Sequence, residues 1–356
     1  MKMKRKVITA LLAATMVASL AVGCGNKGGD SKSDSSKSSS SDEITIGFSQ
    51  VGAESDWRTA NSESMKSTFS EKNGYKLIFD DAQQKQENQI TAIRNFIQQD
   101  VDYIVLAPVT ETGWDTVLKE AKDADIPVII VDRMIDVSDD SLYTAWVGSN
   151  FKMEGQKACE WLNAYAEAKG MKEVNIAHIQ GTIGASAQIG RTEGFDEAVE
   201  AHDNWTTLAQ QSGEFTQAKG QEVMESILKQ SGDDIDVVYC ENDNEAFGAI
   251  DAIKAAGYEV GGEEGQILVM SFDTTNAGLT QTLSGEITCD TECNPLHGPR
   301  VEEIIQKLEA GEDVDKQAYV DEVAFAADDT VTKVTIDGTD YDITPITQEI
   351  IDGRAY

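Results

Sequence analysis

Short, almost wholly aliphatic segments that recur along the chain constrain its fold more than any other feature. The clearest lies at residues 126–131. Residues 101–106, 174–179 and 237–240 are mainly apolar too, although they include Asp102, Asn175 and His178. Segments of this length with apolar residues on both faces are typical of strands buried inside a parallel sheet. Stretches with apolar residues at helical spacing separate them. The pattern predicts βαβ units with right-handed crossovers.

The alternation of strands and helices runs through two successive halves of the chain. We expect strands in the first half from residue 44 and at residues 75–79, 101–106, 126–131 and 143–148. We expect strands in the second half at residues 174–179, 207–211, 237–240 and 267–272. The fold class is therefore α/β, with two doubly wound parallel-sheet lobes and a cleft between them.

Polar side chains follow most of these strands. The first strand runs into Glu54, Asp56, Trp57 and Arg58, and the strand at 126–131 runs into Asp132-Arg133. The carboxyl ends of parallel strands form the ligand-binding edge of such sheets. Ordinary loop polarity and helix capping explain several of these ends. An Arg beside an Asp after a buried strand is costly unless both are paired or hold a ligand.

Composition limits the possible partners. The 356 residues have room for two domains, and the formal net charge is −34. Phosphate backbones and anionic lipid surfaces require basic protein surface, so we expect no nucleic-acid partner and no peripheral site on anionic lipid. The acidic surface is explained by solubility alone.

The N-terminal sequence is typical of an export signal. Four of the first six residues are basic, an apolar stretch follows, and residues 20–24 resemble a bacterial lipobox ending at Cys24. The resemblance implies a lipoprotein signal peptide at residues 1–24 with lipidated Cys24. Residues 25–42 contain no large apolar residue and predict a flexible tether. The folded body is then expected on the extracytoplasmic face of the membrane, held by its lipid anchor.

The remaining cysteines give neither a disulfide framework nor a metal site. Cys159, Cys240, Cys289 and Cys293 have no paired spacing, and no second CxxC or histidine cluster completes a zinc set. Buried or free thiols are expected, and no metal or cofactor.

Enzyme motifs are incomplete. The turn at residues 181–186 lacks the Lys of a P-loop, and residues 184–188 fail the GxSxG pattern. The acidic run at 241–245 lacks the Gly and closing Glu of a calcium loop. We therefore expect no catalytic activity.

Five segments carry a family resemblance: FSQVGAESDWR, DDAQQKQENQI, IPVIIVDR, QGTIGASAQIGR and QSGEFTQAKGQEVMES. From Ile44 to the C-terminus the chain resembles the sugar-binding receptors of ABC transporters. These form the ribose/galactose group with the type I periplasmic-binding fold, and the galactofuranose/galactose-binding member is the most similar. The resemblance implies three crossings between lobes and a ligand held between them. It places one lobe at 43–149 plus about 294–323, and the other at 150–290 plus about 324–356.

The resemblance also implies a set of ligand-binding residues. These are Glu54, Asp56, Trp57, Arg58, Asp132, Arg133, Arg191, Phe215, Asn242, Asp273 and Glu292. Asp56 replaces a small residue of the family pattern. Carboxylates, guanidiniums and an amide suit sugar hydroxyls, and aromatic rings suit the C–H face of a sugar. For Trp57 and Phe215, the alternative to contact with a sugar is ordinary packing inside the protein.

The expected function is that of a monomeric receptor. It would capture a galactose- or galactofuranose-like monosaccharide by lobe closure and deliver it to an ABC permease and ATPase. The alternative is a sensor that presents its liganded form to a membrane signalling protein, and a neighbouring permease gene would favour transport. Residues 331–343 predict a hairpin about Asp337-Gly338 to which no function is assigned.

Overall fold

The computed structural model describes residues 43–356, of which Ile44–Tyr356 form one compact unit. The predicted signal peptide, the lipidation site Cys24 and the tether at 25–42 lie outside the described residues. Within residues 43–356, no helix combines the length and the apolar character that a membrane crossing needs.

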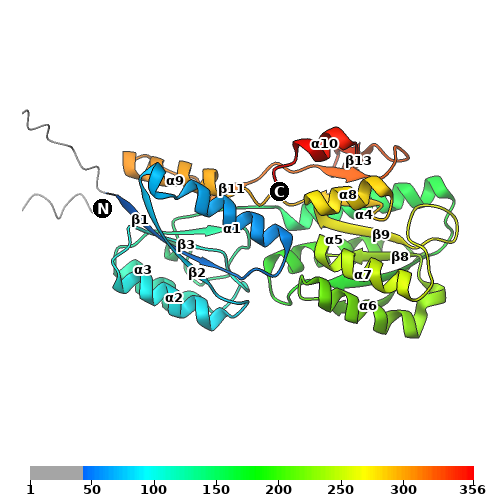
Figure 1. Cartoon of the computed structure of the whole chain (residues 1–356), viewed down its shortest axis with the longest axis horizontal. Helices are drawn as coiled ribbons and strands as arrows, with labels where there is room; N and C mark the ends of the chain where they lie inside the picture. Colours follow the sequence, from blue (N-terminus) through cyan, green and yellow to red (C-terminus); the bar gives the residue numbers. More distant parts are fainter. Residues whose placement is uncertain (1–42) are drawn as a thin grey trace, which may run out of the picture. The chain divides into compact units, whose positions relative to one another are not determined.

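The first sheet is parallel throughout, with strand order β11-β5-β4-β3-β1-β2. Its strands are β1 (Ile44–Gln50), β2 (Tyr75–Asp81), β3 (Tyr103–Leu106), β4 (Val128–Val131), β5 (Ala145–Gly148) and β11 (Gln317–Tyr319). Its helices are α1 (Asp56–Thr68), α2 (Gln86–Gln98), α3 (Asp115–Asp123) and α9 (Gly298–Ala310), with short 3-10 turns η2 (Glu71–Asn73) and η3 (Asp140–Leu142). Helices α2 and α3 lie on the opposite side of the sheet from α1 and α9 (Figure 1).

Strand β4 shows why its sequence is continuously aliphatic. Val128 and Ile130 join the core under α2 and α3, whereas Ile129 and Val131 join the core under α1 and α9. Successive side chains of a strand point to opposite faces, so a strand with helices on both sides needs apolar residues at every position.

The second sheet is mixed, with strand order β13-β14-β12-β10-β9-β8-β6-β7. The pairs β10–β12 and β13–β14 are antiparallel, and the other pairs are parallel. Its strands are β6 (Val174–Gln180), β7 (Trp205–Ser212), β8 (Val237–Cys240), β9 (Leu268–Asp273), β10 (Cys289–Glu292), β12 (Ala324–Ala326), β13 (Lys333–Ile336) and β14 (Thr339–Pro345).

Helices again cover both faces of this sheet. They are α4 (Phe151–Lys169), α5 (Ser186–Ala201), α6 (Gln217–Ser231), α7 (Asp243–Ala255), α8 (Asn276–Ser284) and α10 (Gln348–Gly353), with a 3-10 turn η4 (Gly232–Asp234). Trp161 of α4 and Phe195 of α5 belong to one core, and Met224 of α6 and Ile250 of α7 belong to the other.

The chain passes from one sheet to the other three times. The crossings are at residues 149–150, 293–297 and 320–323, and together we call them the hinge. This arrangement confirms the predicted fold of two parallel-sheet α/β lobes joined by three segments. The antiparallel strands at the edge of the second sheet were not part of the doubly wound prediction.

The predicted C-terminal hairpin is present as β13 and β14. Asp337 and Gly338 form its turn with φ angles of 49° and 78°. Two successive positive φ angles are the signature of a type I′ turn, which matches the twist of the flanking strands. Val334 and Ile343 then pack into the core of the second lobe.

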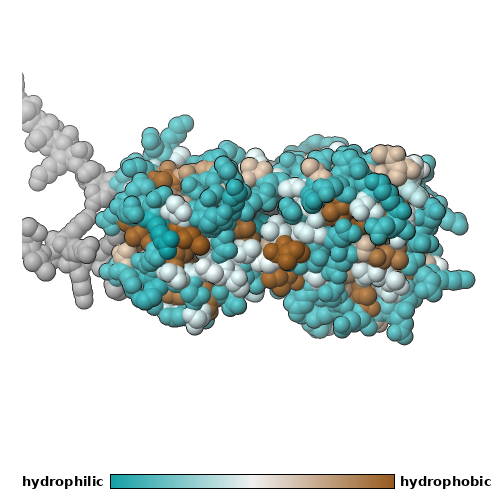
Figure 2. All heavy atoms as spheres, turned by 90° about the horizontal axis from the view of Figure 1, so that it is seen from below, coloured by the Kyte–Doolittle hydropathy of each residue, from teal (hydrophilic) through white to brown (hydrophobic). Residues whose placement is uncertain are grey.

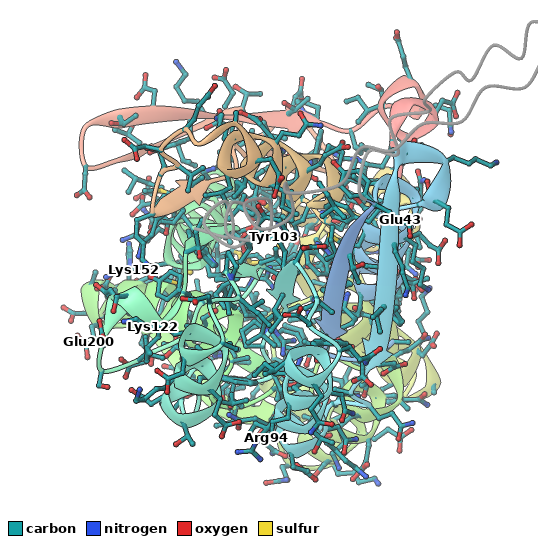
Figure 3. The ribbon with its side chains drawn as sticks, turned by 90° about the vertical axis from the view of Figure 1, so that its left-hand side faces the viewer. Glu43, Arg94, Tyr103, Lys122, Lys152 and Glu200 are labelled. Carbon is teal, nitrogen blue, oxygen red and sulfur yellow. The ribbon has the colours of Figure 1, made fainter. Side chains whose placement is uncertain are left out.

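The surface is mainly hydrophilic (Figure 2), as expected of a chain with 26% charged residues. Figure 2 shows a face covered mainly by hydrophilic residues, with small separate hydrophobic groups. Arg94 and Lys122 are labelled in Figure 3. Arg94 pairs with Glu120 at 2.9 Å, and Lys122 pairs with Asp139 at 3.5 Å. Exposed pairs of this kind contribute about 0–1 kcal/mol each. The surface charge therefore favours solubility rather than a particular fold.

Candidate functional site

A small buried pocket lies where the carboxyl ends of the two sheets meet. The space between its lining atoms is about 290 Å³, including the part open to solvent, and its enclosed free volume is about 20 Å³. Loops after β1 and β4 supply one wall, and segments that follow β6, β7, β8 and β9 supply the other. The lining residues are Glu54, Ser55, Trp57, Arg58, Asp132, Arg133, Phe151, Ala187, Arg191, Phe215, Asn242, Asp273 and Cys293.

Arg58 is fixed in the first lobe by carboxylates on two loops. Ser55 caps α1 by accepting from the Arg58 backbone N–H at 3.1 Å, which places the Arg58 side chain at the start of the helix. Its Nε donates to Glu54 Oε1 at 2.8 Å, and its Nη1 donates to Asp132 Oδ2 at 2.7 Å. Burial alone would lower the pKa of Arg58, but the two carboxylates raise it above its usual value.

Asp132 stays ionised inside the pocket. Burial raises its pKa, but the positive charges of Arg58 and Arg133 more than offset that effect and lower the pKa below its ordinary value. An ionised carboxylate is an acceptor only, with room for several donors. Asp132 can therefore accept from Arg58 and from a ligand hydroxyl at the same time.

The Arg133 guanidinium has N–H donors that are not used by hydrogen bonds to the described part of the chain. Its Nη1 donates to the Val109 carbonyl at 2.9 Å, the one hydrogen bond that its guanidinium makes to the described part of the chain. Its closest carboxylate oxygens, on Glu54 and Asp132, are 3.8 and 4.0 Å away. Burial and the charge of Arg58 lower the pKa of Arg133 to about 10. A guanidinium has five N–H donors, so Arg133 is suited to bind an acceptor in the pocket.

Arg191 is the corresponding cation of the second lobe. Its Nε donates to Glu154 Oε2 at 2.7 Å, its Nη1 donates to the Glu241 carbonyl, and its Nη2 lies 3.5 Å from Asp273 Oδ1. Burial raises the pKa of Asp273 well above its ordinary value despite the opposing charge of Arg191. Asp273 can therefore both donate and accept hydrogen bonds when it is protonated.

Aromatic side chains close the pocket from both lobes. Trp57, Phe151 and Phe215 belong to one buried cluster that includes Cys293. The Trp57 ring nitrogen donates to the Cys293 carbonyl at 2.6 Å, and Arg133 lies over the Phe215 ring at 5.1 Å. The Trp57 ring thus packs in the pocket cluster of the two lobes, not in the core beneath α1.

Three pocket residues have positive backbone φ angles, which residues other than glycine rarely adopt. The φ angles are 62° for Asp132, 61° for Phe215 and 109° for Asp273. Such angles cost about 1–3 kcal/mol each and are retained where the surrounding structure fixes them. Gly181 makes the Phe215 position possible, because a Cβ there would lie 1.9 Å from Phe215 Cζ. Three of the ten non-glycine residues with positive φ in the described part of the chain thus line this pocket, and strained positions often occur at functional sites.

Direct hydrogen bonds join the lobes around the pocket. The Met134 N–H donates to Ser186 Oγ at 2.8 Å, and the Glu111 N–H donates to the Gly184 carbonyl at 2.9 Å. The pocket is therefore shut, and a ligand inside it would be surrounded by both lobes.

Nine of the eleven residues predicted from the sequence line the pocket. Asp56 and Glu292 do not. The Asp56 side chain is exposed on the first turn of α1, and its backbone N–H donates to Asn244 Oδ1 at 3.0 Å. Glu292 Oε1 accepts from Arg354 and from Tyr356, so this carboxylate ties the C-terminal segment to the hinge.

Four lining residues were missed by the sequence reasoning: Ser55, Phe151, Ala187 and Cys293. Ser55 precedes a helix and is a capping signal, and its neighbours were already in the predicted set. Phe151 and Ala187 carry no polar group that would single them out. The four cysteines 159, 240, 289 and 293 are buried and unpaired among the described residues, and burial raises the pKa of each.

Known proteins resemble this chain over most of its length. The model of the periplasmic binding protein domain matches residues 46–291. The galactofuranose-binding protein YtfQ of Escherichia coli is 46% identical over 259 residues, which cover 72% of this chain and 79% of that protein.

Solved structures also resemble this chain over most of its length. A Mycobacterium smegmatis protein in complex with β-D-fucofuranose has a TM-score of 0.76 at 42% identity, covering 81% of this chain and 92% of that chain. A second structure is the binding component of the arabinose ABC transporter from Shewanella sp. ANA-3, bound to L-arabinofuranose. It has a TM-score of 0.74 at 43% identity, and the match covers 81% of this chain and 93% of that chain. The chain belongs to the periplasmic-binding-protein family.

Proposed function

We propose that this protein is the extracytoplasmic receptor of an ABC sugar importer. It captures one monosaccharide by closing its lobes and delivers it to the permease, with no catalytic step. The observation that carries this proposal is the buried pocket between the lobes, in which three Arg and three acidic side chains lie among aromatic rings.

The charges of the pocket suit a neutral, hydroxyl-rich ligand. Arg58, Arg133 and Arg191 face Glu54, Asp132 and Asp273, so neither sign dominates. Each sugar hydroxyl both donates and accepts, and it can bridge an acid and a guanidinium. The rings of Trp57 and Phe215 supply apolar faces for the C–H groups.

Galactofuranose or a closely related furanose is the ligand that we propose. In this shut form the pocket has a free volume of only about 20 Å³, which argues against an oligosaccharide as the ligand. The names of relatives with 42 to 46% identity include galactofuranose, fucofuranose and arabinofuranose. The five-membered ring common to those names supports the same class here.

We also propose how the receptor is held at the membrane. A diacylglycerol on Cys24 and the polar tether at 25–42 keep a monomer near its permease. Its lobes are residues 43–149 plus about 294–323, and residues 150–290 plus about 324–356. We assign sugar contacts to the nine predicted residues that line the pocket.

A thermal-shift and calorimetry panel tests the proposal. D-galactose, L-arabinose, D-fucose, D-fructose, D-ribose and D-xylose are offered at equal concentration, and a bound ligand stabilises the fold by RT ln(1 + [L]/Kd). We expect galactose, arabinose or fucose to raise the melting temperature most. Since the furanose is a minor form in solution, the apparent affinity should improve with a ligand locked as a methyl furanoside. A shift with none of these sugars contradicts the proposal.

A further inference from the structure

All three hinge crossings meet at the side chain of Glu322. Its Oε1 accepts from Ser149 Oγ at 2.6 Å and from the Asn294 N–H at 2.7 Å. Ser149, Asn294 and Glu322 belong to the first, second and third crossings. One carboxyl oxygen therefore links the three segments about which the lobes would move.

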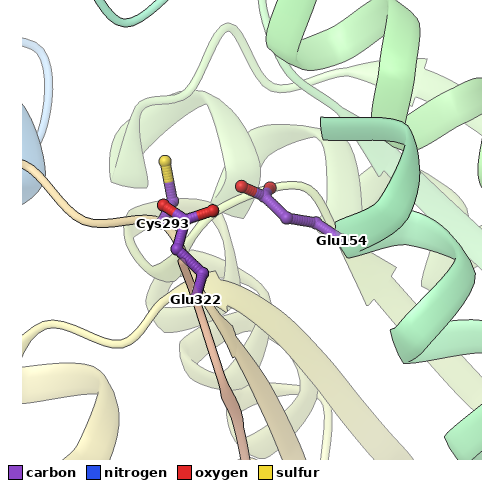
Figure 4. A group of neighbouring side chains, drawn as sticks. All are labelled: Glu154, Cys293 and Glu322. Carbon is purple, nitrogen blue, oxygen red and sulfur yellow. The ribbon is translucent and has the colours of Figure 1, made fainter. Parts of the chain in front are cut away.

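Glu154 connects this junction to the pocket. It lies on α4 with only 1% of its surface exposed, and its Oε2 accepts from Arg191 Nε at 2.7 Å. Its other oxygen, Oε1, has no hydrogen-bond donor in the part of the chain that the structure describes. Figure 4 shows the Glu154 and Glu322 carboxyl groups pointing toward one another, with Cys293 beside them, and one ligating atom from each of the three lies within 4.8 Å of the others.

A buried carboxylate oxygen without a hydrogen-bond donor is energetically unfavourable. A proton on the facing Glu322 carboxyl would remove that cost by donating to Glu154 Oε1. Burial raises the pKa of both groups, and the negative charge of Glu154 raises that of Glu322 further. The charges of Arg191 and Lys157 oppose the effect at Glu154, and hydrogen bonds from Ser149 and the Asn294 N–H oppose it at Glu322, whose pKa nevertheless stays well above its ordinary value. We therefore place the proton on Glu322.

A metal ion is the competing way to fill this gap. Arg191 and the Lys157 ammonium, which donates to the Glu322 carbonyl at 2.7 Å, already bring positive charge to the cluster. Burial also raises the pKa of the Cys293 thiol, and a protonated thiol is a poor metal ligand. The site is thus better suited to a proton than to a divalent cation.

We propose that Glu322 is a positioning residue for sugar binding: its protonated carboxyl holds Glu154, and Glu154 in turn holds Arg191 in the pocket while the three crossings stay joined. The proposal rests on the proposed function, because it describes how the same pocket is kept in shape. Glu322 itself does not line the pocket.

The groups around Glu154 and Glu322 determine how sugar affinity depends on pH. The charged and titratable groups that act on the pair and its neighbours are Arg191, Lys157, Cys293, Asp273, Glu292 and Asp321. As the pH rises through the elevated pKa of Glu322, the proton leaves and two carboxylates face each other. Sugar affinity should then fall. Each unit by which sugar binding raises this pKa corresponds to about a tenfold loss of affinity at high pH.

Calorimetric titration with the best sugar of the panel, from pH 5.5 to pH 9, tests the proposal on the full-length protein. Glu322→Gln is the main variant, because the amide reproduces the protonated carboxyl: its NH₂ donates to Glu154 and its oxygen accepts from Ser149 and Asn294. Glu322→Ala removes the group. Glu197→Gln is the matched control, since Glu197 is an exposed acid on the same helix as Arg191 and pairs with Lys152.

We expect wild type and Glu197→Gln to lose about tenfold in affinity toward pH 9. Glu322→Gln should match wild type at pH 6 and keep its affinity at pH 9, whereas Glu322→Ala should bind weakly throughout. The proposal is overturned if Glu322→Gln binds as weakly as Glu322→Ala at pH 6, or if its pH profile follows wild type. It is also overturned if EDTA weakens wild-type binding and Zn²⁺ or Mn²⁺ restores it, since that result indicates a metal site. Absence of any sugar binding by wild type refutes the proposed function instead.

Discussion

Replacing Asp132 with Asn removes one negative charge from the pocket and leaves its shape almost unchanged. In wild type, Asp132 Oδ2 accepts from Arg58 Nη1 at 2.7 Å and lies 4.0 Å from Arg133 Nε. Hydrogen bonds to charged groups contribute about 1.5–3 kcal/mol, and neutral ones about 1 kcal/mol. A hydrogen bond between this side chain and a neutral sugar hydroxyl therefore loses about 0.5–2 kcal/mol. For one sugar hydroxyl this loss weakens binding by about 2- to 30-fold.

The same substitution should lower stability in a pH-dependent way. Arg58 and Arg133 lower the pKa of Asp132 in the folded protein despite its burial. A lowered folded pKa stabilises the protein above the unfolded pKa of about 3.9, and that stabilisation is lost as the pH falls through the folded value. Asp132→Asn should therefore melt below wild type at pH 7, and the gap should narrow below about pH 4.

Calorimetry gives the affinity, and thermal melts at pH 7 and pH 3.5 give the stability. Asp123→Asn is the control, because Asp123 is an exposed acid that pairs with Lys119 on the surface of the same lobe. The reasoning is refuted if Asp132→Asn binds sugar within twofold of wild type, or if its melting temperature at pH 7 equals that of the control.

Three further changes have clear expected results. Gly181→Ala should displace the Phe215 ring, because the new Cβ would lie 1.9 Å from it, and should weaken sugar binding at least tenfold by calorimetry; wild-type affinity would contradict this. Arg191→Ala leaves Asp273 without its cation, and should abolish most sugar binding while far-UV circular dichroism stays native; retained affinity would contradict the pocket assignment. Cys24→Ala should move the protein from the membrane fraction to the medium in cell fractionation, and unchanged membrane retention would refute the anchor.

Much of the fold could be predicted because its strands are buried on both sides. β4 and β8 are continuous apolar runs, and helices with clear apolar faces separate the strands. The antiparallel edge of the second sheet could not be predicted as a whole. Its hairpin turn at Asp337-Gly338 has a local signature, but the attachment of β14 to β12 depends on pairing between segments with no such signature.

The site was predictable where polar residues follow buried strands. Asp132 and Arg133 stand out because charges beside a buried strand require partners. Cys293 did not stand out, since it joins the pocket through its backbone carbonyl and its packing against Trp57. The role of Glu292 depends on the distant Arg354, which spacing along the chain does not reveal.

A crystal structure of the protein grown with galactose tests the central claim most directly. We expect density for one five-membered sugar ring between the two lobes. The rings of Trp57 and Phe215 should cover its apolar faces, and its hydroxyls should lie within hydrogen-bond distance of Asp132, Arg133 and Arg191. A six-membered ring in that place would contradict the furanose assignment. Sugar bound elsewhere, with this pocket empty, would contradict the proposed binding site altogether.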